Sequence, residues 1–128
     1  THTQYIQDNQ LIRQVYQTDL ANRSTYFVLT QAIGSSCEGM ASISAYHLSK
    51  TKLVMAPVFQ IKNKRIQHID VPFDCHAFPD NSPYLADRTK VTEYLIRVDP
   101  KMQFIDVQLL NQQHVPQNKY FHYKYNNC

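Results

Sequence analysis

In the first 33 residues, apolar side chains recur mostly at helical spacing, and neither Gly nor Pro interrupts the pattern. The apolar positions that share one face are Tyr5, Ile12, Tyr16, Leu20 and Phe27. Gly34 follows directly, and Gly ends helices readily because it adopts left-handed conformations. The spacing therefore predicts one long amphipathic helix over residues 1–33, which buries its stripe of Ile12, Tyr16, Leu20 and Phe27 against the rest of the protein.

A rival interpretation breaks this helix near Asn22. The stretch "TYFVLTQAI", residues 25–33, is rich in Tyr, Phe, Val, Thr and Ile. These residue types favour strands, because their branched and aromatic side chains fit a pleated surface. The pattern alone does not exclude this second interpretation.

After Gly39 the period of the pattern shortens and turn residues become frequent. "KLVMAPVFQI" and "RIQHIDVPF" flank "KNK", which predicts a hairpin, and the stretches on either side of "DPK" predict a second one. "YFHYKY" near the C-terminus is expected to form a last, edge strand. The predicted fold is α+β: a single domain over 1–128, with the helix at 1–33 packed on an antiparallel sheet of four to six strands within 40–128.

The composition is that of a globular protein, and the charge changes the picture little. The chain has 128 residues, 43% of them hydrophobic, with a net charge of +3. The basic residues are scattered apart from "KNKR" at 62–65. A nucleic-acid-binding domain usually carries a denser basic stripe, so we expect nucleic acid to be an unlikely partner. The alternative, phosphate contacts from "KNKR" with stacking on the Tyr-rich tail, stays open.

The chain contains three cysteines, Cys37, Cys75 and Cys128, and no pair with the spacing of a metal site. This usage favours an oxidising compartment over a set of unrelated reduced thiols. Cys128 is the last residue, where a disulfide would tie down a chain end that otherwise frays.

No catalytic or cofactor signature is present. Cys37 follows the predicted helix C-terminus, where the negative end of the helix dipole disfavours a thiolate nucleophile. Asp74, Cys75 and His76 are adjacent on a predicted strand, so they point to alternate faces and do not converge on a metal. Two glycines in the chain are too few for a phosphate-binding loop. We therefore expect no enzyme activity, no cofactor and no metal.

The turn "DNSPYLAD" carries Asp80, Asn81 and Asp87, which could form a weak calcium site. The spacing lacks the ligand rhythm of an EF-hand, so the stretch is better interpreted as a turn.

Two further function classes stay open. One is a secreted or periplasmic binding module, such as an inhibitor or a toxin-immunity protein, which requires no catalytic set. The other is a small basic nuclease toxin, which would use some of four histidines as acid–base groups together with Lys or Tyr. These histidines are His47, His68, His114 and His122.

The stretch "FVLTQAIGSSCEG" carries a resemblance to a known family. Its marked positions are Phe27, Leu29, Ile33, Gly34, Cys37 and Gly39. It is similar to the end of the N-terminal helix in minor pilins of type IV pili and minor pseudopilins of type II secretion. The resemblance implies a non-enzymatic assembly subunit in the periplasm or at the cell surface, whose partners are other pilin-class subunits.

The resemblance carries two further expectations. The chain begins without Met, so it would be a piece of a longer protein whose missing N-terminal segment anchors it in the inner membrane. A disulfide commonly closes the C-terminal region in this family, which implies that Cys128 bonds to Cys75 rather than to Cys37.

Overall fold

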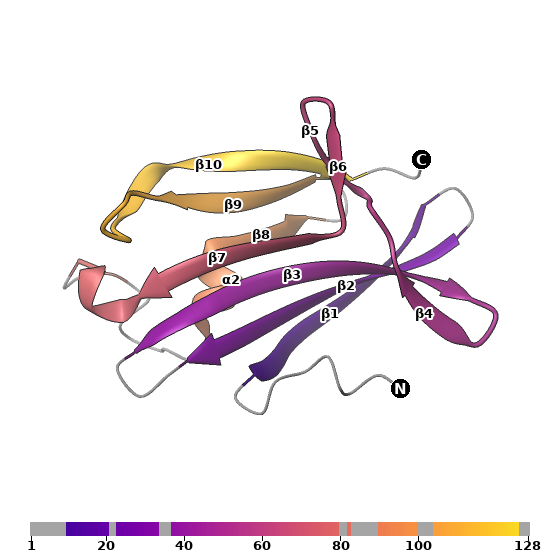
Figure 1. Ribbon diagram of the computed structural model, residues 1–128, viewed down its shortest axis with the longest axis horizontal. Coiled ribbons are helices and arrows are strands. Elements are labelled where there is room, and N and C mark those ends of the chain that lie inside the picture. Colours follow the sequence, from indigo (N-terminus) through magenta and orange to yellow (C-terminus); the bar gives the residue numbers. More distant parts are fainter. Residues whose placement is uncertain are drawn as a thin grey trace.

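The computed structural model describes residues 10–20, 23–33, 37–79, 82, 90–99 and 104–125. Within them the chain folds into two antiparallel sheets of five strands each (Figure 1). The strands of the first sheet are β1 (Gln10–Leu20), β2 (Arg23–Ile33), β3 (Glu38–Ser49), β4 (Lys52–Met55) and β7 (His68–Asp74). Those of the second sheet, in spatial order, are β6 (Lys64–Ile66), β5 (Phe59–Ile61), β10 (Pro116–Tyr125), β9 (Phe104–Leu110) and β8 (Ile96–Asp99).

The first sheet is organised around β3. On one side β3 pairs with β2, and on the other it pairs with β7 through its first half and with β4 through its last four residues. β1 pairs with β2 at the edge of the sheet. Two short helical segments complete the described structure, a 3-10 turn at Cys75–Ala77 and the helix α2 at Val91–Leu95.

The predicted N-terminal helix is wrong, and with it the α+β fold. Residues 10–33 form the antiparallel hairpin of β1 and β2, in which Tyr16 lies opposite Phe27. In β2, the side chains at alternate positions are buried: Thr25, Phe27, Leu29 and Gln31. This period of two is that of a strand with one face on the core, so the rival interpretation of residues 25–33 was the correct one.

A β-bulge places two apolar residues of β1 on one face at a spacing typical of a helix. The register shifts between Ile12 and Gln14, so Arg13 is an extra residue in β1. Ile12 lies opposite Thr30 and Val15 opposite Val28, which places both on the same face although they are three positions apart. Spacing by three is the spacing expected of a helix, and here the bulge produces it.

The four residues predicted to form a helical packing stripe do not share one face. Tyr16 and Phe27 lie opposite each other on the core side, whereas Ile12 pairs with Thr30 on the other side. Phe27 is almost fully buried, whereas Ile12 is half exposed and Tyr16 is partly buried. Leu20 ends β1. The predicted helix stop at Gly34 lies outside the described residues.

Several of the strands expected after Gly39 are confirmed. β5 and β6 form the hairpin around "KNK". The strands expected on either side of "DPK" also pair, as β8 and β9, but the first begins only at Ile96, because Val91–Leu95 is α2. In β7, Ile69, Val71 and Phe73 are buried at every second position. The C-terminal strand β10 exists, but it is not an edge strand, because it pairs with both β9 and β5.

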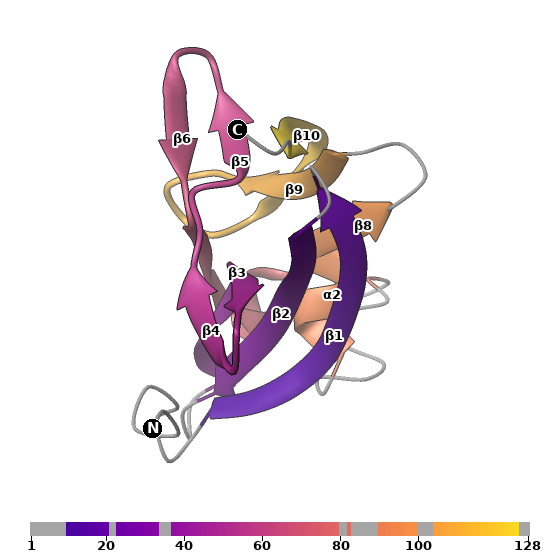
Figure 2. The same ribbon diagram turned by 90° about the vertical axis from the view of Figure 1, so that its right-hand side faces the viewer.

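The two sheets bury one apolar core between them. The Phe27 ring of β2 contacts the Phe59 ring of β5, with centroids 5.4 Å apart. α2 lies between the sheets and contacts β2 and β3 of one and β8 and β9 of the other (Figure 2). Two hairpins extend away from this core, β5–β6 from the second sheet and β3–β4 from the first (Figure 1).

Gly39 is required by a close approach inside the first sheet. A Cβ atom at this position would overlap the backbone oxygen of Ala32 and would come within 2.6 Å of a Phe73 ring carbon. A real Cβ atom does not approach other atoms so closely, so this part of β3 can pack against β2 and β7 only without a side chain.

Candidate functional site

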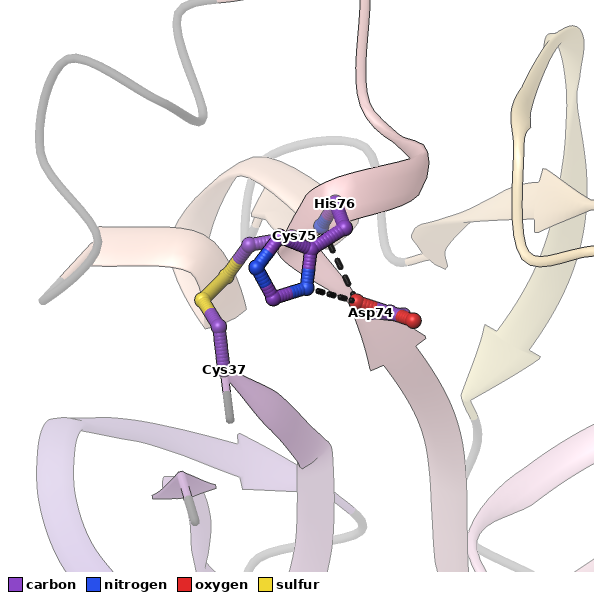
Figure 3. The surroundings of a disulfide bond; sticks show 4 residues. All are labelled: Cys37, Asp74, Cys75 and His76. Atoms are coloured by element: carbon purple, nitrogen blue, oxygen red, sulfur yellow. Dashed lines mark hydrogen bonds and ion pairs between the residues drawn. A yellow bond between two sulfur atoms is a disulfide. The ribbon is translucent and has the colours of Figure 1, made fainter. Parts of the chain in front are cut away.

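A disulfide joins Cys37 to Cys75 at the end of the β3–β7 pair (Figure 3). The neighbouring residues Glu38 and Asp74 are the last partners in that register, and the Cys75 N–H donates to the Cys37 carbonyl. The expected Cys75–Cys128 bond is wrong, because the Cys75 sulfur is bonded to Cys37. Cys128 lies outside the described residues.

The disulfide is a structural brace. Cys37 and Cys75 are both almost fully buried, so neither sulfur is accessible as a nucleophile. Beside them, the Asp74 carboxylate accepts the His76 backbone N–H at 2.9 Å, and this bond is the main reason that the Asp74 pKa lies below its usual value. Disulfides of this kind are typical of oxidising compartments.

The strongest cluster of chemically interesting side chains is a polar ladder across β3 and β7. The Ser44 hydroxyl lies 2.7 Å from His68 Nδ1, His68 Nε2 lies 2.6 Å from Asp70, and the Ser42 hydroxyl donates to Asp70 at 2.6 Å. Ser42 lies opposite Asp70 and Ser44 opposite His68, so the sheet register itself brings the four together. Sequence reasoning singled out His68 but missed the two serines.

The residue types of this ladder are those of a serine hydrolase, but its setting is not. β3 pairs on both sides along this stretch, so its backbone N–H groups beside Ser44 are already bound within the sheet. A nucleophilic serine needs free donors for the oxyanion that forms in the reaction. The ladder is better described as cross-strand hydrogen bonding that fixes β7 on β3.

The four histidines of the nuclease hypothesis are on separate parts of the molecule. His47 lies on the face of β3 opposite to Ser44, and its buried Nε2 has no hydrogen-bond partner. Burial, and next the charge of Arg23, hold the pKa of His47 below its usual value. His114 lies in the turn after β9, and His122 forms an ion pair with Asp106 on β10 and β9.

Metal and membrane sites have little support in the described part of the chain. No cluster of three or more His, Cys, Asp or Glu side chains there could hold a metal ion. The candidate calcium ligands Asp80, Asn81 and Asp87 lie outside it. No helix among the described residues has the length and apolarity that crossing a membrane requires.

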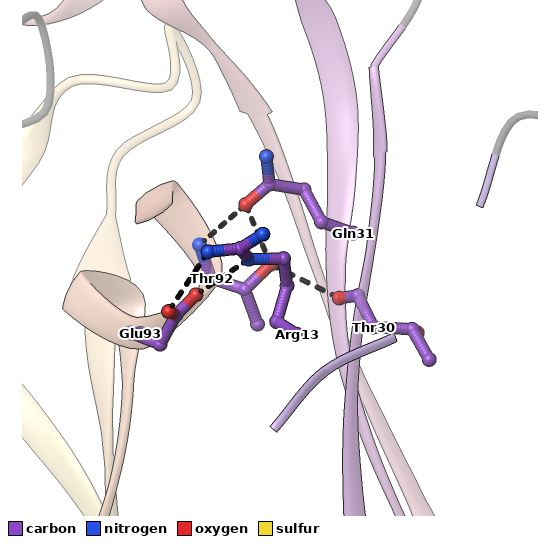
Figure 4. Close-up of polar contacts among 5 residues, drawn as sticks. All are labelled: Arg13, Thr30, Gln31, Thr92 and Glu93. Carbon is purple, nitrogen blue, oxygen red and sulfur yellow. Dashed lines mark hydrogen bonds and ion pairs between the residues drawn. The ribbon is translucent and has the colours of Figure 1, made fainter. Parts of the chain in front are cut away.

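A second polar cluster joins the β1–β2 hairpin to α2 (Figure 4). The bulged Arg13 forms an ion pair with Glu93, with its Nε 3.1 Å from the carboxylate. Gln31 Oε1 accepts the Thr92 backbone N–H at 2.8 Å and the Thr92 hydroxyl at 3.0 Å. These contacts fix the position of the β1–β2 hairpin relative to the core. The sequence pattern gave no indication of them.

Large apolar side chains collect on the solvent side of the first sheet. Pairing places the following side chains on the face opposite to the core, and we call them the outer apolar face: Ile12, Val15, Tyr26, Val28, Tyr46, Leu48, Leu53 and Met55. Val15 and Leu53 are each 55% exposed. Among the described residues, seven of the eight exposed large hydrophobic side chains belong to this sheet, and five of them lie on the outer apolar face: Ile12, Val15, Leu48, Leu53 and Met55.

Such a concentration is unusual for a surface that only contacts water. Single exposed apolar residues are common, but apolar side chains gathered on one face mark binding surfaces. In the sequence, the signal for this face is the run "KLVM", which follows a turn and is too short to be a buried helix. In the structure all four residues of this run are exposed.

Comparisons of the chain with protein-family models, with curated proteins and with solved structures found no match. The function is therefore inferred from the surfaces of the molecule itself.

Proposed function

We propose that the protein is a non-enzymatic binding module that captures a partner protein along β1 and the outer apolar face. The single observation that carries this proposal is the exposed apolar surface that lies beside a long edge strand. β1 is 11 residues long and pairs with β2 on one side, and no strand of the described chain pairs with its other side.

The edge of β1 has the properties that favour addition of a strand from another chain. An unpaired edge presents a row of backbone N–H and C=O groups that an extended segment can bind. Natural edges are usually protected by charge, yet Leu11, Ile12 and Val15 are each at least half exposed here. The bulge at Arg13 interrupts the edge, so the regular part available for pairing is residues 14–20.

The partner that fits is a protein with an extended apolar segment. Its backbone would pair with residues 14–20, and its side chains would cover Val15 and Val28. The Cys37–Cys75 disulfide supports a place of action in an oxidising compartment, outside the cytoplasm. Of the function classes left open by the sequence, an inhibitor or immunity protein is one that acts by binding a protein partner and needs no catalytic set.

The pilin-class assignment loses the feature on which it chiefly depended. Residues 23–33, which carry most of the resembling stretch, form β2 rather than the end of a helix. Membership of that family remains a prediction from the sequence, and the binding surface proposed here does not depend on it.

The proposal is tested by adding a charge to the edge. Val15→Lys places a cation beside the pairing edge and on the outer apolar face, and we expect at least tenfold weaker binding of the partner. Gln112→Lys adds the same charge on an exposed turn of the second sheet and should leave binding unchanged. A partner is first captured from the compartment in which the protein is made, and it is then purified. Calorimetry measures its affinity for the unmodified protein, for Val15→Lys and for Gln112→Lys.

Hydrogen exchange of the purified complex then locates the contact. Slower exchange of backbone amides in 14–20 is the expected result. A partner that binds Val15→Lys as tightly as the unmodified protein, or protection confined to the second sheet, would contradict the proposal. Association of the chain with itself through β1 would also contradict it, because the partner would then be a second copy.

A further inference from the structure

The two sheets differ in charge. The second sheet and its turns, over residues 59–66, 96–99 and 104–125, carry six basic side chains and two acidic ones. The basic residues are Lys62, Lys64, Arg65, Arg97, Lys119 and Lys124, and all six are exposed. The first sheet and its turns, over 10–20, 23–33, 37–55 and 68–74, carry four of each sign.

The register gathers several of these cations with aromatic rings on the solvent side of the second sheet. Gln60 lies opposite both Arg65 and Lys124, and Phe104 lies opposite both Lys124 and Asp99. These residues form one row across all five strands, in which two cations accompany one acidic side chain, and the buried Phe59 lies on the other face. The next row contains His122, Asp106 and Arg97. We call the following set the aromatic–basic face: Arg65, Arg97, Phe104, Tyr120, His122 and Lys124.

The rings of this face are held in place by contacts with one another. The Arg97 guanidinium lies over the Tyr120 ring, 4.9 Å from its centroid, and the Phe104 and His122 rings have centroids 5.1 Å apart. Arg97 and His122 are nonetheless exposed to solvent. Nucleobases stack on such rings and on guanidinium planes, and the gain is similar for every base.

The β5–β6 hairpin extends the basic surface. Lys62 and Lys64 flank its turn and are exposed, and the hairpin projects beyond the rest of the molecule in both views (Figures 1 and 2). In the sequence, "KNKR" and the Tyr-rich tail are more than fifty residues apart, and the pairing of Lys124 with Gln60 brings them into one sheet. Arg65 of the hairpin and Lys124 of the tail, which are far apart in the sequence, thus lie on one face of the fold.

We propose that the aromatic–basic face and the β5–β6 hairpin bind single-stranded nucleic acid without strong sequence preference. The exposed Lys and Arg side chains favour a polyanion as the ligand. The aromatic rings and the guanidinium planes favour a polyanion whose bases can stack on them. An anionic membrane would be expected to engage exposed apolar side chains as well. Those lie on the first sheet, with Phe121 the only large one exposed on the described part of the second. This proposal is independent of the protein partner proposed for β1.

The test is fluorescence anisotropy with a labelled 20-nucleotide oligo(dT) at a series of salt concentrations. If the six cations all contact phosphates, the slope of log K against log salt is about −4, since each contact to a single strand contributes about −0.7. Replacing Lys62, Lys64 and Arg65 together by Gln should reduce the steepness of that slope by about 2. The matched control replaces Arg23, Lys50 and Lys52 of the first sheet by Gln, with the same loss of charge, and should bind like the unmodified protein.

The stacking part of the proposal is tested separately by His122→Ala. His122 is exposed, so the fold should tolerate the change, which circular dichroism checks. Loss of one stacking group is expected to weaken oligo(dT) binding about fivefold while leaving heparin binding unchanged. Four outcomes would overturn the proposal: no binding at low salt, equal losses in the two triple variants, tighter binding of heparin with no effect of His122→Ala, or binding to anionic vesicles in preference to oligo(dT).

Discussion

The two sheets share one core, but they differ in the lengths of their strands, in their charge and in the side chains of their outer faces. The first has three strands of 11 or 12 residues, a covalent brace at one end, and equal numbers of acidic and basic residues. Its outer surface carries the outer apolar face and, beside it, the polar ladder of β3 and β7. Four of the five strands of the second have seven residues or fewer, and its outer surface is basic and aromatic. Since the inner faces alone suffice to form the core, the outer faces are free to serve two different partners.

The largest expected effect comes from the disulfide at the end of the first sheet. Replacing Cys37 and Cys75 together by Ser removes a bond that spans 38 residues, and we expect the free energy of unfolding to fall by about 3–4 kcal/mol. Urea denaturation measures this. Cys128→Ser is the control, and a loss of the same size in that variant would show that the pairing described here is incorrect.

The next effect concerns packing inside the first sheet. Gly39→Ala introduces a Cβ atom against the Phe73 ring and the Ala32 backbone, and β3 must shift to admit it. We expect a loss of about 2–3 kcal/mol in the free energy of unfolding, in the range typical of overpacked cores. Ser49→Ala, at the exposed end of the same strand, should change stability by less than about 0.5 kcal/mol. Equal effects of the two changes would contradict the tight approach at Gly39.

One buried glutamine in each sheet allows a direct comparison. Gln31→Ala leaves the buried Thr92 N–H without its acceptor and should cost about 1–3 kcal/mol. Gln108→Ala removes a donor to the backbone carbonyls of Gln117 and Lys119. Both residues are exposed, so we expect water to replace the lost donor. We expect thermal unfolding to show a clearly smaller loss for Gln108→Ala. The reverse order would mean that the second sheet depends more on its polar contacts than the first.

The smallest effect is a dependence of stability on pH that arises in the first sheet. The pKa of His47 is lower in the folded protein than its usual value of 6.5, mainly because of burial. The neutral form is therefore favoured by folding, so the stabilising contribution is complete above pH 6.5 and is lost as the pH falls through the lower pKa of the folded state. NMR titration of the histidine rings should show His47 protonating below 6.5, and His47→Gln should flatten the stability curve in this window. A His47 pKa above 6.5 would contradict the burial described here.

How far the sequence could predict the fold depends on which strand is considered. β7 was predictable because Ile69, Val71 and Phe73 alternate without interruption, and β5–β6 because turn residues separate two β-rich runs. β1 was not predictable in this way. Its bulge shifts the alternation by one residue, so that Ile12 and Val15 acquire helical spacing, and no local signal marks the extra residue Arg13.

The clusters of side chains that lie across several strands were less predictable than the strands themselves, for a physical reason. The polar ladder of Ser42, Ser44, His68 and Asp70 exists only because β3 and β7 pair in one register, across more than twenty residues of intervening chain. The same is true of the aromatic–basic face, which needs β10 between β9 and β5. Both depend on long-range pairing, which the side-chain pattern of a single segment does not encode.

The position of the disulfide has a mechanical consequence. Between Cys37 and Cys75 the chain leaves the first sheet, forms β5 and β6 in the second, and returns as β7, so the bond closes a covalent ring that includes parts of both sheets. Tension applied through the two chain ends passes across the sulfur atoms and bypasses this ring. While the bond is intact, about 125–135 Å of contour length stays hidden from a pulling force, and reduction releases it in a single additional step of extension.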